Sequence, residues 1–192
     1  FAGQQETYLN ISGVDNVVHS ARKCMASLFT DRAIAYRVEN GFDHMQVALA
    51  VGIQQMVAVR SEAAGVMFTL DMESGFRDVV TINSIYGLGE NIVQGKVSPD
   101  EFTVFKTTGT ILKKKLGAKR LKMVPGEDST TKDIDVPETD QHRYSITDEQ
   151  VKTLAECGMA IEEHYGKPMD IEWALDEDFG TLFIVQARPE TV

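Results

Sequence analysis

Residues 168–187, PMDIEWALDEDFGTLFIVQA, decide the fold of this chain. Two mainly apolar stretches flank an acidic turn that ends in Gly180, and this is the pattern of a β-hairpin. The pattern predicts one strand over residues 168–175 and its partner over residues 181–187.

The first of these strands carries two carboxylates on one face. Met169, Ile171 and Trp173 alternate with Asp170 and Glu172, so the apolar side chains share one face and the acids share the other. Carboxylates two residues apart on a strand lie close enough to share a hard cation, such as a Mg²⁺ that bridges nucleotide phosphates. The alternative is a solvent-facing polar stripe on a half-buried strand, and the spacing by itself leaves both open.

The partner strand adds an amide and a guanidinium. Gln186 and Arg188 stand two residues apart after a continuous apolar run. Arginine offers a rigid fork of donors to phosphate oxygens, and glutamine supplies a carbonyl to a metal or an amide to a nucleotide. Together with the two acids they suit a phosphate and metal site, although Arg188 can equally form a simple ion pair with Glu172 or Glu190.

Alternating and β-branched residues predict the other strands of the sheet. These strands are expected over residues 47–59, 65–70, 79–82, 102–106 and 111–116. Glycine-containing turns join the second to the third and the fourth to the fifth, which indicates two more hairpins. Residues 86–95 are expected to form a loop or short helix, and residues 124–143 a long surface connection.

Three helices are predicted from apolar spacing and capping residues. A capping box at Ser12 opens the first helix, and Thr30 caps the second. Another capping box, at Thr147, opens the third helix, which ends at Gly166. Helices and hairpins together predict an α+β fold with a largely antiparallel sheet and flanking helices.

The composition excludes two classes of function. The 192 residues carry a formal net charge of -10, which argues against a nucleic-acid surface, because phosphate binding needs clustered Lys and Arg. Only residues 111–122 are locally basic, and we interpret them as a solvated strand face. No apolar run approaches the roughly 18 residues of a membrane span. Cys24 and Cys157 lack metal or disulfide spacing and are expected to be reduced core thiols of a cytoplasmic protein.

Two glycine-containing loops are weaker candidates for a site. Gly3 and Thr7 lie in the opening loop, whose backbone N–H groups can cradle a phosphate, although many surface loops have this composition. This chain opens inside that loop without a Met, so we expect it to be a fragment. The GLGEN motif at residues 87–91 is more typical of a turn, yet Glu90 is a candidate second acid facing a nucleotide. The four histidines share no ligand spacing and are expected to be structural or exposed.

The chain resembles the nucleotide-binding domain of the phosphoenolpyruvate synthase family, within the pyruvate phosphate dikinase-like group. The resemblance is carried by FAGQQETYLN at 1–10, AGVMFTLDMESGFRDVV at 64–80, YGLGENIVQGKVSPDEF at 86–102, YGKPMDIEW at 165–173 and IVQARPETV at 184–192. It implies an ATP-grasp fold in which residues 1–192 form part of the ATP-binding domain, with Mg²⁺ bound alongside ATP.

The resemblance also implies a reaction. In this family an ATP-grasp domain passes the β,γ-pyrophosphoryl group of ATP to a histidine on a swivelling domain, water removes one phosphate, and the phosphohistidine then phosphorylates pyruvate. The products are phosphoenolpyruvate, AMP and phosphate. An upstream lobe, the phosphohistidine domain and the pyruvate barrel are expected to be absent from this chain, which alone should bind Mg-ATP weakly and turn over little. The full-length protein is expected to be a cytoplasmic homodimer.

Roles for individual residues follow from the same resemblance. The implied ATP-binding residues are Gly3, Thr7, Gln54, Glu172, Gln186 and Arg188. Of these, Glu172 and Gln186 are implied to contact the metal as well, with Asp170 as a third candidate. No catalytic residue is expected within the chain, because none of its histidines has the threonine-serine-histidine context of the phosphohistidine.

Two alternative functions stay open at this stage. The acceptor site is expected to lie outside the chain, so the domain could belong to a related dikinase or to an antibiotic phosphotransferase. A non-catalytic module that binds ATP without chemistry is the alternative from a different class.

Overall fold

The computed structural model describes residues 5–57, 61–176 and 180–190. The chain divides into two compact units. Residues 1–56 and 125–131 form the first unit, and residues 57–124 and 132–192 form the second.

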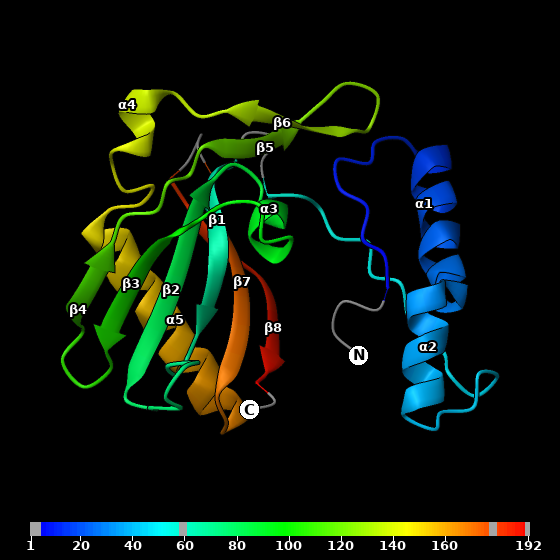
Figure 1. Cartoon of the computed structure of the whole chain (residues 1–192), viewed down its shortest axis with the longest axis horizontal. Helices are drawn as coiled ribbons and strands as arrows, with labels where there is room; N and C mark the ends of the chain where they lie inside the picture. Colours follow the sequence, from blue (N-terminus) through cyan, green and yellow to red (C-terminus); the bar gives the residue numbers. More distant parts are fainter. Residues whose placement is uncertain (1–4, 58–60, 177–179, 191–192) are drawn as a thin grey trace. The chain divides into compact units, whose positions relative to one another are not determined.

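The second unit contains a six-stranded sheet with the strand order β4-β3-β2-β1-β7-β8 (Figure 1). Its strands are β1 (Ser61–Phe68), β2 (Val79–Tyr86), β3 (Asp100–Phe105), β4 (Thr110–Lys115), β7 (Met169–Asp176) and β8 (Leu182–Pro189). All neighbouring strands pair antiparallel. The three predicted hairpins are therefore confirmed, as is the largely antiparallel α+β fold.

Five helices and one short 3-10 turn accompany the strands in the described residues. They are α1 (Val14–Ala26), the 3-10 turn η1 (Ser27–Phe29), α2 (Asp31–Glu39), α3 (Glu90–Val93), α4 (Glu138–Gln141) and α5 (Asp148–Tyr165). The capping box of α5 is present, since Thr147 Oγ1 accepts from Gln150 N at 3.2 Å and Gln150 Oε1 accepts from Thr147 N at 2.8 Å. Gly166 ends the helix with a φ of 68°, a left-handed conformation that glycine adopts without steric cost.

The core of the second unit lies between α5 and one face of the sheet. Four residues of α5 are buried there, namely Val151, Leu154, Ala155 and Gly158. The sheet contributes Ala63, Met67, Val80, Ile82, Phe102, Val104, Met169, Ile171, Trp173 and Leu175. Removing this apolar surface from water is the main stabilising term of the unit. The opposite face carries Asp170 and Glu172 of β7 beside buried apolar residues such as Ala64 and Ile85.

A buried ion pair anchors the start of β3. Asp100 and Lys119 have fully buried side chains and form an ion pair at 2.6 Å. Asp100 also accepts hydrogen bonds from Gly117 N at 2.9 Å and from the backbone N and Oγ of Ser145, both at 2.8 Å. The carboxylate is thus satisfied on both oxygens, which a buried charge requires.

The first unit contains α1, η1 and α2. Thr30 Oγ1 accepts from Ala33 N at 3.4 Å, so the predicted cap of α2 is confirmed. Arg37 is only 3% exposed, and its guanidinium donates to His44 Nδ1 at 2.9 Å. Asn10 Nδ2 donates to the carbonyl of Thr130 at 2.6 Å, which ties the turn at residues 125–131 into this unit.

Three sequence-based predictions were wrong. Residues 47–57 form no strand, because β-branched composition favours a strand only where another edge satisfies its backbone groups; residues 58–59 lie outside the described part. Residues 124–143 contain the end of β5 (Leu121–Pro125), all of β6 (Thr131–Asp135) and α4, and β5 pairs with β6. The first helix starts at Val14 on a glycine N-cap that has no side chain to form the predicted capping box.

Other features agree with the composition. Lys113 and Lys115 of the basic stretch are exposed and lie 3.9 and 2.8 Å from Glu101, as expected of a solvated strand face. The prediction was wrong for Lys119 of the same stretch, because its ammonium is fully buried against Asp100. Cys24 and Cys157 are free thiols and both are half-buried, with Cys157 packed against the core. Among the described helices, none has the length and apolar character needed to cross a membrane.

Candidate functional site

The candidate site lies on the face of the sheet opposite α5. Along β7, Met169, Ile171 and Trp173 are almost fully buried in the core, and Asp170 and Glu172 point to the other face, as the alternation predicted. Asp170 is only 8% exposed and Glu172 is half-buried. The strand therefore does not carry a simple solvent-facing polar stripe.

A β-bulge sets which residues of β8 face these acids. Trp173 pairs with Ile184, but the register shifts by one residue and Glu172 pairs with Gln186. Without the shift, Glu172 would lie opposite Val185. β-Bulges re-aim side chains in this way and are frequent beside functional sites. The bulge brings both polar side chains of β8 onto the face that carries the two acids.

Glu172 and Gln186 form the first polar pair. Gln186 Nε2 donates a hydrogen bond to Glu172 Oε1 at 3.1 Å. Because the amide nitrogen of Gln186 faces the carboxylate, its amide oxygen can bind a cation. A carboxylate and an amide oxygen side by side are hard oxygen ligands of the kind that Mg²⁺ prefers.

Asp170 and Arg188 form the second pair, one step along the same strands. Arg188 Nη2 lies 2.6 Å and Nε lies 2.7 Å from Asp170 Oδ2. The sequence left open an ion pair of Arg188 with Glu172 or Glu190. In the structure Arg188 pairs with Asp170 instead. The contact holds the guanidinium on the polar face, and the Arg188 side chain is 45% exposed and so accessible to an anion.

Glu172 is electrostatically strained in the absence of a cation. Burial raises the pKa of its carboxyl, the positive charge of Arg188 lowers it, and the negative charges of Asp170 and Glu90 raise it further. A bound cation would relieve both the burial cost and the repulsion between these acids. The donor set therefore fits a divalent metal.

Glu90 comes to this site from a distant part of the chain. It is the first residue of α3, and the preceding Gly89 lies over the sheet, where an added Cβ would be 3.7 Å from the Cβ of Ala64. Ala64 and Ala174 are a cross-strand pair, so α3 begins over the face of β1 and β7 that carries Glu172. The sequence singled out Glu90 only through its GLGEN motif.

Glycine is needed where the chain enters α3. Gly87 has a φ of 74°, and a Cβ there would come within 2.3 Å of Met123 O. Leu88 N donates to that same carbonyl at 2.9 Å. The GLGEN segment is thus fastened to β5, which directs the chain back over the sheet toward Glu172.

The remaining predicted site residues belong to the first unit. Thr7 and Gln54 are exposed there, in stretches without helix or strand. Gly3 lies outside the described residues. The structure therefore brings together Asp170, Glu172, Gln186 and Arg188, with Glu90 added, and leaves the roles of Gly3, Thr7 and Gln54 as predictions.

The protein ligands alone do not complete a metal site. Within residues 5–57, 61–176 and 180–190, no cluster of three or more His, Cys, Asp and Glu side chains could hold a metal ion. Magnesium in nucleotide sites is often held by one or two carboxylates plus the phosphates of the substrate. Glu172 with Gln186 suits that mode of binding.

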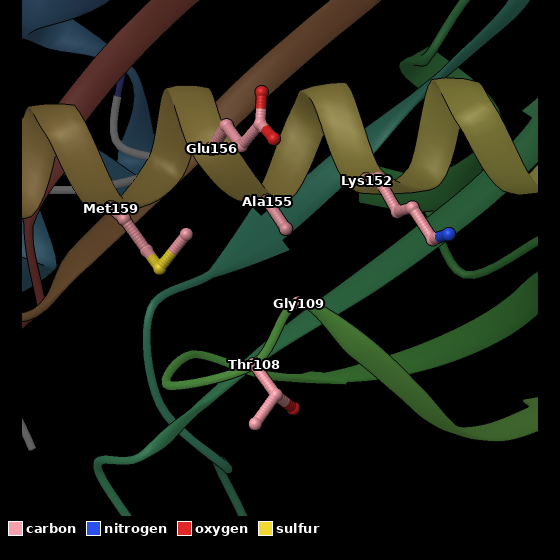
Figure 2. A pocket seen from close by; sticks show the side chains of 6 residues that line it. All are labelled: Thr108, Gly109, Lys152, Ala155, Glu156 and Met159. Carbon is pink, nitrogen blue, oxygen red and sulfur yellow. The ribbon is translucent and has the colours of Figure 1, made fainter.

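A separate hollow of about 320 Å³ lies on the other side of the sheet, between α5 and the β3–β4 turn. Figure 2 shows Ala155 and Met159 on the side of α5 that faces Thr108 and Gly109. The hollow contains none of the predicted site residues, and its lining does not bring together several charged groups around one point. We therefore interpret the hollow as a surface depression beside the helix and not as a ligand site.

The chain is similar to known proteins along its whole length. All of residues 1–192 match the family model described as "Pyruvate phosphate dikinase, AMP/ATP-binding domain". The chain is 57% identical over 201 residues to a phosphoenolpyruvate synthase of Pseudomonas aeruginosa, 54% over 204 residues to one of Aquifex aeolicus and 51% over 201 residues to one of Escherichia coli. Each match covers 100% of this chain but only 24–25% of the relative. The chain thus spans about a quarter of the length of these curated relatives.

Proposed function

The chain belongs to the pyruvate phosphate dikinase AMP/ATP-binding domain family, and we propose that its polar sheet face binds Mg-ATP for phosphoryl transfer in a phosphoenolpyruvate synthase. The observation that carries the proposal is the facing pair of Glu172 and Gln186, with Arg188 and Asp170 beside it. This set offers oxygen ligands to a metal and a guanidinium to phosphate on one surface.

Each residue has a proposed role. Glu172 and Gln186 hold the Mg²⁺ that accompanies ATP, and the ion neutralises charge on the phosphate oxygens when bound. Arg188 binds a phosphate group through its fork of donors, and Asp170 orients that fork through the ion pair at 2.6 Å. Glu90 adds negative charge that favours the cation.

An ATP-grasp arrangement is part of the proposal. The antiparallel sheet with its polar face supplies one side of such a site. Gly3, Thr7 and Gln54 are proposed, from the resemblance, to contact the nucleotide as well. Phosphoryl transfer depends mainly on positioning and charge neutralisation, which metal ligands and a guanidinium on one surface suit.

The complete reaction is proposed for the full-length protein. ATP, pyruvate and water would give phosphoenolpyruvate, AMP and phosphate through a phosphohistidine, as the resemblance implies. The names of the relatives support the synthase over a related dikinase or an antibiotic phosphotransferase. We further propose that the full-length protein is a homodimer, which light scattering on the purified protein would test, and that it is cytoplasmic, which cell fractionation would test.

The experiment follows AMP formation by the full-length protein. ATP with pyruvate is expected to give AMP and phosphoenolpyruvate, and Glu172→Ala should abolish both. Inorganic phosphate added together with pyruvate, with pyrophosphate as the extra product, tests the related dikinase. A rifamycin antibiotic in place of pyruvate tests the antibiotic phosphotransferase. If the protein binds ATP but consumes none with any acceptor, the non-catalytic module is the better account.

A further inference from the structure

The short helix that carries Glu90 needs contacts with other elements to stay in place. α3 spans only the four residues Glu90–Val93, and helices shorter than about 12 residues are marginal in water without tertiary contacts. Its place over the sheet is therefore set by other elements. On one side, Met123 of β5 accepts from Leu88 N just before the helix.

On another side, the carboxylate of Asp133 in β6 contacts two side chains from the segment around α3. Asn91 Nδ2 donates to Asp133 Oδ1 at 2.9 Å, and Lys96 Nζ lies 3.5 Å from Asp133 Oδ2. The two contacts differ in how much they stabilise the segment. Asn91 is fully buried, whereas the Lys96 and Asp133 side chains are 47% and 31% exposed, and exposed ion pairs contribute little.

The buried amide makes Asp133 important for the placement of α3. Asn91 Oδ1 already lacks a hydrogen-bond partner among the described residues. Removing the acceptor on Asp133 would leave the amide nitrogen unpaired too, and a buried polar group without a partner is strongly disfavoured. The segment would then shift to bring Asn91 to water, and Glu90, its neighbour in the helix, would shift with it.

We propose that Asp133 is a positioning residue for the ATP site. By holding Asn91, it fixes α3 so that Glu90 stays over the face of the sheet that carries Glu172 and Gln186. The inference rests on the proposed function of that face. Asp133 itself acts only through Asn91 and Glu90 and is given no contact with the nucleotide.

The test measures kcat and KM for ATP in pyruvate-dependent AMP formation by the full-length protein. Asp133→Ala removes the acceptor for Asn91, and Asp133→Asn keeps an acceptor but removes the charge. Asp135→Ala, two residues along the same strand, is the matched control for the loss of one exposed carboxylate. Glu90→Gln and the double variant Glu90→Gln with Asp133→Ala complete a double-mutant cycle.

Misplacement of a charged group in a phosphoryl-transfer site costs up to about 100-fold in rate. We expect Asp133→Ala to lower kcat/KM for ATP roughly tenfold or more, and Asp133→Asn and Asp135→Ala to stay near the wild-type value.

The double-mutant cycle of Asp133→Ala and Glu90→Gln gives the decisive result. If Asp133 acts through Glu90, adding Asp133→Ala to Glu90→Gln causes no further loss. An equal loss in both backgrounds, or a loss in Asp133→Asn as large as in Asp133→Ala, would overturn the positioning role. The proposed function fails separately, if Glu172→Gln leaves the activity unchanged.

Discussion

Glu172 and Gln186 face each other across β7 and β8, with Gln186 Nε2 donating to Glu172 Oε1 at 3.1 Å. The pairing depends on the one-residue shift in register just beyond Glu172. A bulge at this point turns an otherwise regular hairpin into a surface with two polar pairs in succession. We propose that a metal binds this arrangement. Without a metal the burial of the Glu172 carboxylate is unfavourable, and the first prediction follows from that cost.

Glu172→Gln should stabilise the metal-free protein at neutral pH. The folded-state pKa of Glu172 is raised, mainly by burial, so between the unfolded and folded pKa values the native state binds more protons than the unfolded state. This contribution to stability is present at low pH and is lost as pH rises from the unfolded pKa of about 4.3 through the folded pKa.

Thermal unfolding from pH 4 to pH 8 in the presence of a chelator checks this prediction. The variant should melt above the wild type at pH 7, and the difference should shrink toward pH 4. A variant that melts lower than the wild type at pH 7 would contradict the account.

Arg188→Lys should weaken Mg-ATP binding by the full-length protein by about tenfold or more, because lysine keeps the charge but loses the fork that Asp170 orients. Isothermal titration measures the affinity. Arg143→Lys is the control, since Arg143 forms an exposed ion pair with Asp140 at 3.1 Å. Equal affinity in Arg188→Lys and the wild type would remove the proposed phosphate contact.

Asp100→Ala should destabilise the fold by about 3–5 kcal/mol, because it leaves the buried Lys119 ammonium without its carboxylate. Glu101→Ala, at the next residue, should cost at most about 1 kcal/mol, since its ion pair with Lys115 is exposed. Chemical denaturation of both variants gives the difference directly. Similar losses of stability in the two variants would mean that the buried ion pair contributes no more than the exposed one.

Gly65→Ala should destabilise the fold. An added Cβ would lie 1.9 Å from Asn83 O and 2.7 Å from Trp173 Cζ2, so the strand or the indole must move, which costs at least about 1–3 kcal/mol. Gly158→Ala is the matched control, because its Cβ would meet Met67 Sδ at 3.4 Å in the interior of α5. There alanine should be neutral or stabilise by up to about 1 kcal/mol. The soluble yield and the denaturation midpoint of both variants test this pair.

The hairpins and caps of the fold could be predicted because their signals are local. Alternation along Met169–Asp176 has a period of two, and the Thr147 capping box lies within four residues. Residues 47–57 show the limit of this reasoning, since a strand also needs an edge to pair with, and sequence composition says nothing of that edge. The short β6 strand was missed because polar residues dominate it.

The site was predictable in its residue types but not in its pairing. The sequence places Glu172 and Arg188 in a hairpin, yet the partner of Arg188 depends on a bulge whose position no local pattern shows. Glu90 lies far from both in sequence and reaches the site through tertiary contacts of the GLGEN segment. Register and tertiary contacts are set by packing of the whole sheet, which a single stretch of sequence does not encode.

The central claim is that Glu172 helps to hold the metal that accompanies ATP. The most direct test is isothermal titration of ATP into the full-length protein and into Glu172→Gln, each with and without Mg²⁺. We predict that Mg²⁺ strengthens ATP binding by the wild type at least about tenfold and that the variant loses most of this gain while its metal-free affinity changes little. The same gain from Mg²⁺ in both proteins would contradict the account.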